Sequence, residues 1–304
     1  MAIQWPLVLF SLMAGAAGGL LALTGLSELL GGSRTVRRRA SWTALVLLVV
    51  GGLASVAHLA SPLNAISAVT NLLSFSGISI ELMLLGANFI VGAAYLVITR
   101  EGDGGAAAKV CAGLAVVCGV AIGFFCGHGY VIDAQPTWAT ETLPLAYLGT
   151  SLALGAFLYA LIAGLAGRPA AKDAGSEAAS AAEAPAPSTA AGELSGKLWL
   201  SVLVCCACCA LGIAAYGLFL GLDVAGAHGA LFWGGCVIVG VAGVLACGIA
   251  GMTALAAKAP VPLAAVGAAC AFVGGIALRV LMWSAATGYL DLFSHTVPSV
   301  MLNL

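Results

Sequence analysis

The sequence contains eight uninterrupted apolar runs, each about 20 residues or longer, separated by charge clusters, prolines and small polar residues. A helix of about 20 apolar residues spans the hydrocarbon core of a bilayer, which is about 30 Å thick. The runs do not alternate apolar with polar residues, so they do not predict membrane β-strands. The sequence therefore predicts an all-α polytopic membrane protein with eight transmembrane helices, over residues 4–31, 41–60, 78–99, 106–127, 143–166, 197–220, 229–256 and 261–284.

The composition agrees with a chain that lies mostly in lipid. Hydrophobic types make up 62% of the 304 residues and charged types 8%, whereas a soluble domain carries about 25% charged residues. The formal net charge of −1 excludes a strongly basic nucleic-acid binder, so we expect no nucleic-acid partner. No Lys or Arg precedes the first run and no small-residue cleavage site follows a short apolar region, so we expect a retained helix rather than a signal peptide.

The basic residues are sorted to one side of the predicted membrane. Cytoplasmic loops are enriched in Lys and Arg, and the loops on the other side, including both termini, contain neither. We therefore expect a multi-pass protein of the cell inner (cytoplasmic) membrane with both termini outward. Arg279, inside the last run, stands apart from the ten basic residues on the cytoplasmic side, which are Arg34, Arg37, Arg38, Arg39, Arg100, Lys109, Arg168, Lys172, Lys197 and Lys258.

One long connection divides the chain. Residues 167–196 are rich in Ala, Pro, Ser and Glu and contain no aromatic residue, a composition typical of a flexible segment. We expect a flexible cytoplasmic linker between residues 1–166, which hold five helices, and residues 197–304, which hold three helices and an outward C-terminal tail.

Ionisable residues inside membrane spans are costly and are functional candidates by default. Glu28 ends the first span just before the arginine cluster, and we interpret it as a member of an interfacial ion pair. His58, Glu81 and Arg279 are all predicted near the outer face. Arg279 follows the start of its helix by a rise of about 27 Å. The alternative for these three residues is that they are interfacial and their heads reach water.

The remaining candidates for metal or haem binding are weak. The four histidines, His58, His128, His228 and His295, all fall on the outer side and form no facing mid-helix pair, so we expect no haem. Cys205, Cys206, Cys208 and Cys209 form a CCxCC pattern, but successive helical residues rotate by about 100° and their sulfurs point in several directions. We interpret the ten cysteines as small apolar filler and expect no metal site and no iron-sulfur cluster in this chain.

Several short motifs are similar to one family of membrane anchors. They are WPLVLF at residues 5–10, ASVAHLASPL at 54–63, SIE at 79–81, PTW at 136–138, and the last span from Gly275 to Tyr289 with Arg279. In their order and topology they resemble the DmsC family, the membrane anchor subunit of dimethyl sulfoxide reductase-type molybdenum oxidoreductases. The resemblance covers nearly the whole chain except the linker.

The resemblance implies a three-part enzyme of anaerobic respiration. The anchor would oxidise menaquinol and pass electrons to an iron-sulfur electron-transfer subunit, which would feed a molybdopterin catalytic subunit on the outer face. It implies that His58 is the leading base or hydrogen-bond partner of the quinol and that Glu81 is the second proton acceptor. Arg279 would orient Glu81 or stabilise negative charge.

Three other functions stay open at this point. One is a docking-only anchor without a quinol site. The second is the anchor of a polysulfide- or nitrite-reductase (NrfD-like) complex. The third is a secondary transporter, which would need broken helices with polar midplane residues.

Overall fold

The structure, a computed structural model, describes residues 3–57, 72–74, 76–166 and 189–286. Within these residues eight helical spans are long and apolar enough to cross a membrane, which confirms the predicted all-α polytopic fold. Two short helices, η1 and α9, accompany them. The elements are α1 Trp5–Leu29, α2 Arg34–Ala57, η1 Leu72–Ser74, α4 Gly77–Ile98, α5 Gly105–His128, α6 Thr142–Ala166, α7 Thr189–Ala227, η2 Ala230–Gly243, α8 Val244–Gly251, α9 Ala254–Lys258 and α10 Pro260–Ser284.

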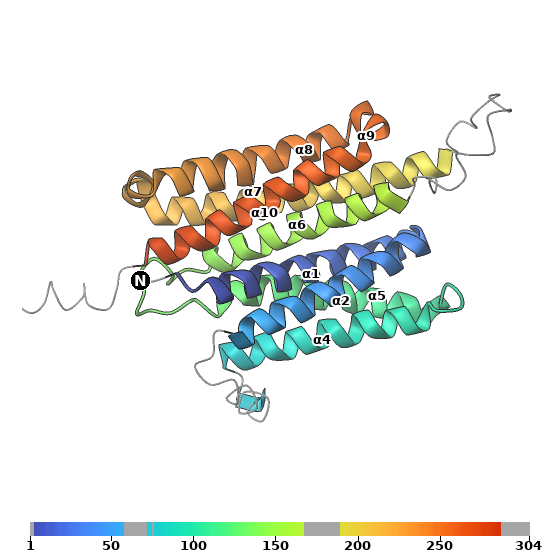
Figure 1. The fold of residues 1–304 in the computed structure, drawn as a ribbon, viewed down its shortest axis with the longest axis horizontal. Helices are drawn as coiled ribbons and strands as arrows, with labels where there is room; N and C mark the ends of the chain where they lie inside the picture. Colours follow the sequence, from blue (N-terminus) through green and yellow to red (C-terminus); the bar gives the residue numbers. More distant parts are fainter. Residues whose placement is uncertain (1–2, 58–71, 75, 167–188, 287–304) are drawn as a thin grey trace, which may run out of the picture.

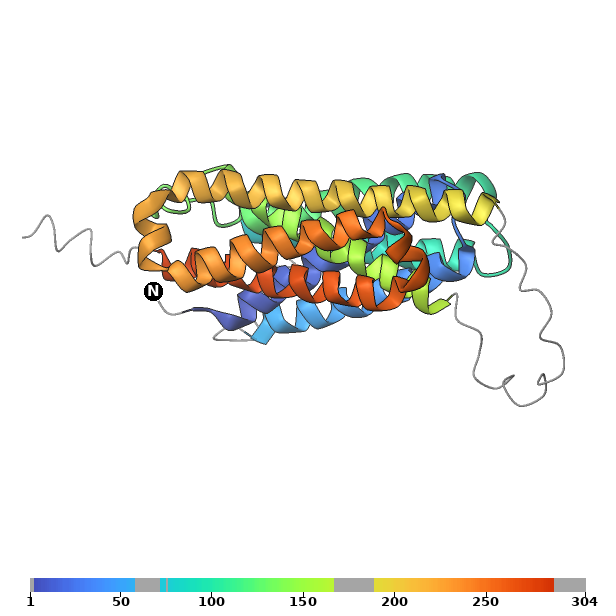
Figure 2. The same cartoon turned by 90° about the horizontal axis from the view of Figure 1, so that it is seen from above.

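The long helices run side by side in an elongated bundle (Figures 1 and 2). Helix α1 lies at its centre and packs against α2, α5 and α6. Within the most apolar window of each span, 83% of α1 is buried in the protein, against 22% of α4. Helix α1 is therefore the core of the bundle, while α4 lies at its periphery.

Small residues allow this central helix to make close backbone contacts. A Cβ on Gly18 would lie 2.7 Å from the carbonyl oxygen of Gly119 in α5. A Cβ on Gly155 in α6 would overlap the backbone of Gly19. Helix pairs in lipid associate through such small-residue contacts, because burial of apolar side chains gives no advantage over lipid. Larger residues at these positions would push α1 away from both neighbours.

The second half of the chain departs from regular α-helix at two places. Gly221 interrupts α7 with φ 77° and ψ 174°, a conformation that glycine adopts without steric cost. The break coincides with the predicted end of the sixth run at residue 220. Residues Ala230–Gly243 form a π-helix before the span continues as α8.

The structure shortens the predicted linker, because α7 begins at Thr189. The remainder of that segment, residues 167–188, lies outside the described residues.

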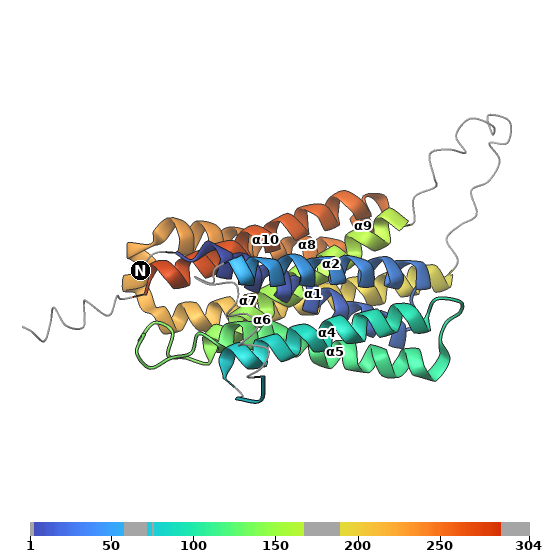
Figure 3. The ribbon, with the colours of Figure 1, turned by 60° about the horizontal axis from the view of Figure 1, so that its bottom comes forward.

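The two ends of the bundle differ in charge. The start of α2 with its arginines, the turn between α4 and α5, and α9 lie at one end, which we call the arginine-rich end (Figure 3). The start of α1 and the end of α10 lie together at the other, which we call the opposite end (Figure 1). The first and last helices thus leave the bundle on the same side, as an even number of spans predicts.

Candidate functional site

The opposite end carries the described members of the predicted site. His58 lies outside the described residues, so its position relative to the others stays a prediction. Glu81 lies in the second turn of α4 and is half-buried. The side chain of Ser76 caps this helix by accepting a hydrogen bond from the Ser79 amide at 3.4 Å. The cap fixes where α4 begins and hence the depth at which Glu81 lies.

The Glu81 carboxyl lies against the end of α5. A Cβ built on Gly129, the residue that follows α5, would be 2.7 Å from Oε1 of Glu81. Only a residue without a side chain leaves room for the carboxyl in this position. His128, next in the chain to Gly129, lies 3.4 Å from Glu141 through its Nδ1 and the carboxylate Oε2. Two acidic groups and one histidine therefore gather near the end of α5.

Arg279 lies in α10 and is fully buried, with 0% of its surface exposed. The interpretation of Arg279 as an interfacial residue whose head reaches water is therefore wrong. Its Nε donates to the Ser11 hydroxyl at 2.9 Å, and its Nη1 donates to the carbonyl of Gly275 at 2.9 Å. Further donations reach the Ser11 carbonyl and the Thr150 hydroxyl. The guanidinium carbon lies 4.3 Å above the centre of the Tyr147 ring, a cation–π contact.

No carboxylate of the described residues forms an ion pair with Arg279. Neutral oxygens and one aromatic ring solvate its charge, although a buried cation without a counter-ion is costly. The side chain joins α1, α6 and α10 at one point. Its positive charge therefore remains available to act on groups at this end of the bundle.

Four aromatic residues surround this region, and we call them the aromatic cluster: Tyr130, Trp138, Tyr147 and Trp283. The rings of Trp138 and Trp283 are 5.0 Å apart edge to face, and Tyr130 lies 5.8 to 6.0 Å from the other three ring centres. The indole of Trp138 donates to the carbonyl of Met282 at 2.9 Å. The loop between α5 and α6 is thereby fixed onto the end of α10.

Tyr130 connects the two charged residues electrostatically. Burial raises the pKa of Tyr130 well above its usual value, the Glu81 carboxylate adds to the rise, and the Arg279 guanidinium opposes it. Both charges are therefore close enough to act on the same phenol, although no ion pair joins them. No pattern in the sequence marks Tyr130, Tyr147 and Ser11 as members of this site, because these residues meet only through folding.

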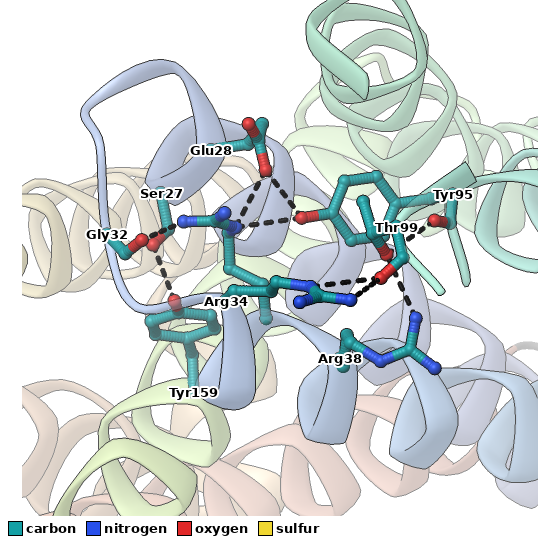
Figure 4. A network of polar contacts seen from close by, with 9 residues as sticks. Ser27, Glu28, Gly32, Arg34, Arg38, Tyr95, Thr99 and Tyr159 are labelled. Carbon is teal, nitrogen blue, oxygen red and sulfur yellow. Dashed lines mark hydrogen bonds and ion pairs between the residues drawn. The ribbon is translucent and has the colours of Figure 1, made fainter. Parts of the chain in front are cut away.

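A second polar network lies at the arginine-rich end (Figure 4). Glu28 accepts a hydrogen bond from the Tyr95 hydroxyl at 2.6 Å and pairs with Nε of Arg37 at 2.7 Å. The predicted ion pair of Glu28 is thus confirmed, and both partners are almost fully buried. Arg37 also donates to the Tyr95 oxygen at 2.8 Å and to the carbonyl of Gly32. Each charged group of this trio has an opposite charge or a hydroxyl beside it, which is typical of a structural contact.

The arginines that flank this trio bind backbone oxygens. Arg34 donates to the carbonyl of Thr99, and Arg38 donates to the Thr99 hydroxyl (Figure 4). Arg34 also donates to the carbonyl of Arg100, and Arg38 to the carbonyl of Leu96. The Tyr159 hydroxyl of α6 donates to the Ser27 hydroxyl of α1 at 2.5 Å. The network therefore fastens α1, α2, α4 and α6 at this end.

The ten cysteines are all free. In the CCxCC pattern Cys208 is exposed and the other three are buried, as expected when sulfurs point in different directions around a helix. Groups of three or more His, Cys, Asp or Glu side chains that could hold a metal are absent from the part of the chain that the structure describes.

Comparison with known proteins agrees with this architecture. The family model described as DMSO reductase anchor subunit (DmsC) matches residues 1–174, more than half of the chain. The chain belongs to the DmsC family. It is also 30% identical over 163 residues to the anaerobic dimethyl sulfoxide reductase chain YnfH of Escherichia coli (strain K12), a match that covers 52% of this chain and 57% of that protein. The chain thus spans little more than half the length of this relative.

The part that matches the DmsC family ends just after α6. It includes the half-buried Glu81, the ion pair of Glu28 with Arg37, and three members of the aromatic cluster. Arg279 and Trp283 lie beyond it in α10. Their place at the site therefore depends on geometry: Arg279 lies over Tyr147 of α6, and Trp283 packs against Tyr130 in the loop between α5 and α6, both within the matched part.

Proposed function

We propose that this chain is the membrane anchor of a dimethyl sulfoxide reductase-like complex and oxidises menaquinol at the opposite end of the bundle. Its partners there would be an iron-sulfur electron-transfer subunit and, beyond it, a molybdopterin catalytic subunit. This end would face outward from the cell inner membrane, because the arginine-rich end suits the cytoplasm. Membership of the DmsC family supports the role of an anchor for such an anaerobic respiratory complex.

The observation that carries the quinol site is the half-buried carboxyl of Glu81 at membrane depth. Oxidation of a quinol releases two electrons and two protons, and each proton needs an acceptor. A carboxylate held against the backbone at Gly129 can take a proton from a lipid-soluble donor and pass it towards water at the end of the bundle. We assign this step to Glu81 and the first hydrogen bond or proton transfer to His58, which directly precedes the segment leading to α4.

Arg279 acts in this proposal through its charge. It is buried, forms no ion pair with a carboxylate of the described residues, and influences Tyr130 together with Glu81. A fixed positive charge in a low-dielectric environment stabilises negative charge that forms nearby. Arg279 is therefore a positioning residue, whereas Glu81 and His58 are the residues proposed to touch the quinol.

The test replaces Glu81 in membranes that contain the whole complex. Two activities are measured: substrate reduction driven by a menaquinol analogue, and substrate reduction driven by an artificial donor that feeds the catalytic subunit directly. Glu81→Gln should lower the first about 100-fold or more, the range for loss of a general base, and leave the second unchanged. Glu141→Gln, an exposed carboxylate at the same end, is the matched control and should change neither.

His58→Ala should give the same pattern as Glu81→Gln. Wild-type quinol oxidation in both variants would identify a docking-only anchor instead. Copurification with the tagged chain tests the partners, and we expect an iron-sulfur subunit and a molybdopterin subunit with dimethyl sulfoxide reductase activity. The subunits of a polysulfide or nitrite reductase would overturn that assignment.

A further inference from the structure

A large cavity lies at the arginine-rich end, away from the proposed quinol site. Its volume is about 560 Å³, within the range of ligand pockets. It opens between α1, α2, α6, α7 and α10, and most of its wall is apolar, with Leu23, Leu26, Ala163 and Trp199 among its residues. It is thus an apolar space at the end of a bundle whose spans cross a membrane.

A basic hollow of about 390 Å³ adjoins this cavity. It is lined by Arg34, Thr35, Arg38, Arg39 and Trp42, and Thr35 also lines the cavity. The indole of Trp42 is 58% exposed, as expected for an aromatic residue at the level of lipid headgroups. An apolar space and a cationic surface therefore meet at one threonine.

The positive charge of this hollow is not neutralised by the residues around it. Neither the cavity nor the hollow is lined by a carboxylate. Arg34 and Arg38 donate to neutral oxygens. Arg39, and Lys197 on the rim of the cavity, are exposed and form no ion pair with the described residues. Within the part of the chain that the structure describes, four cations consequently border one site without a carboxylate beside them.

We propose that an anionic phospholipid binds here, with its phosphate on the arginines of the hollow and an acyl chain in the apolar cavity. A water-soluble anion would use the cations and leave the apolar wall bare. A neutral lipid chain would fill the cavity and leave the cations unpaired. Only an amphiphile with an anionic head matches both surfaces, and basic pockets between membrane helices bind such headgroups.

Phosphatidylglycerol is the probe that tests this site. The full-length chain, purified in detergent, is titrated with phosphatidylglycerol or with phosphatidylcholine of the same acyl chains and followed by native mass spectrometry. Phosphatidylglycerol should bind at least 10-fold more tightly. Equal affinities of the two lipids would overturn the proposal.

Charge variants test the headgroup contact. Arg39→Gln and Lys197→Gln should each weaken phosphatidylglycerol binding about 5-fold. Lys109→Gln, exposed at the start of α5 and outside the cavity lining, should leave it unchanged. Neither Arg39 nor Lys197 pairs with a carboxylate of the described residues, so both variants should fold. Unchanged binding in both variants would refute the headgroup contact.

Filling the cavity tests the acyl contact. Ala163→Phe places a ring in the cavity and should weaken phosphatidylglycerol binding about 10-fold or more. Ala107→Phe, on the exposed surface of α5, should have no effect. If glycerol 3-phosphate bound as tightly as phosphatidylglycerol, the site would be one for a soluble phosphate and the lipid would be excluded.

The chain itself offers a competing occupant. Residues 167–188, outside the described residues, contain Asp173, Glu177 and Glu183. Neutralising these three carboxylates together should leave phosphatidylglycerol affinity unchanged. A rise of 10-fold or more would mean that this segment, and not a lipid, covers the cations in the native protein.

Discussion

Two buried arginines at opposite ends of the bundle have different partners. Arg37 is 4% exposed and pairs with the carboxylate of Glu28. Arg279 is 0% exposed and is surrounded by hydroxyls, carbonyls and the Tyr147 ring. Both are solvated by the protein, but only one has a counter-ion. An arginine therefore forms a charge-neutral structural contact at one end of the bundle, and another arginine is a source of positive potential at the other.

The difference predicts which end tolerates which change. Removing one partner of a buried ion pair leaves an uncompensated charge. Removing Arg279 leaves only groups that keep other partners, because the hydroxyls of Ser11 and Thr150 also donate to backbone carbonyls of their own helices. Loss of Glu28 should thus affect stability, and loss of Arg279 should chiefly affect function.

The largest expected effect comes from Glu28→Gln. The change leaves Arg37 charged and buried without its carboxylate, which should lower the free energy of unfolding by about 3–5 kcal/mol. Denaturant unfolding of the purified chain in detergent measures this loss. The control is Glu101→Gln, which changes an exposed carboxylate in the turn between α4 and α5 and should leave the free energy of unfolding unchanged. The double variant Glu28→Gln, Arg37→Gln should recover more than half of the loss, and failure to do so would show that the ion pair is not the cause.

Arg279→Gln should have the next largest effect, and on activity. Menaquinol-driven reduction should fall about 10-fold, equivalent to about 1.4 kcal/mol, because a positive charge near the site is gone. Activity from the artificial donor should not change. Arg279→Lys, which keeps the charge and loses the planar fork, should retain more activity than Arg279→Gln. If Arg279→Gln were as active as the wild type, Arg279 would contribute only to packing.

Gly129→Ala should produce a smaller loss. The new methyl group would meet Oε1 of Glu81 and displace the carboxyl by several tenths of an ångström. Quinol-driven activity should fall about 5-fold, with a shifted pH profile and unchanged assembly. Gly113→Ala in α5 is the matched control, because a Cβ there meets no atom within 4 Å. If the two variants had identical activities, Glu81 would not take part in the proton transfer.

The smallest effect should come from Tyr159→Phe at the arginine-rich end. This change removes a neutral hydrogen bond to the Ser27 hydroxyl and leaves the ion pair intact. The free energy of unfolding should decrease by about 0.5–1.5 kcal/mol, well below the loss in Glu28→Gln. If Tyr159→Phe lowered the free energy of unfolding as much as Glu28→Gln, the charge of the ion pair would not explain the stability of this network.

Much of the fold could be predicted from the order of apolar and charged segments. Eight spans, the shared side of the first and last helices and the ion pair of Glu28 all follow from runs of about 20 residues and from the position of the arginines. The break at Gly221 also follows, because the sixth apolar run ends there. These features depend on distance along the chain, which a sequence states directly.

The burial of Arg279 could not be predicted in the same way. A count of residues gives its depth along α10 but not the face of the helix on which it lies. In a soluble helix a polar face would mark the outside, whereas here both the lipid-facing and the buried faces are apolar. The contacts of Arg279 with Ser11 and Thr150 span 268 and 129 residues, and only folding brings them together.

The glycine contacts of α1 also have a mechanical consequence. With Gly18 against Gly119 and Gly19 against Gly155, backbone lies close to backbone at both contacts, and the Ile122 side chain of α5 packs against Gly18. The central helix therefore holds α5 and α6 at fixed heights, and with them Gly129 and Tyr147. Such a bundle would act as a stiff spacer that keeps the proposed quinol site at constant depth beneath any subunit seated on its end.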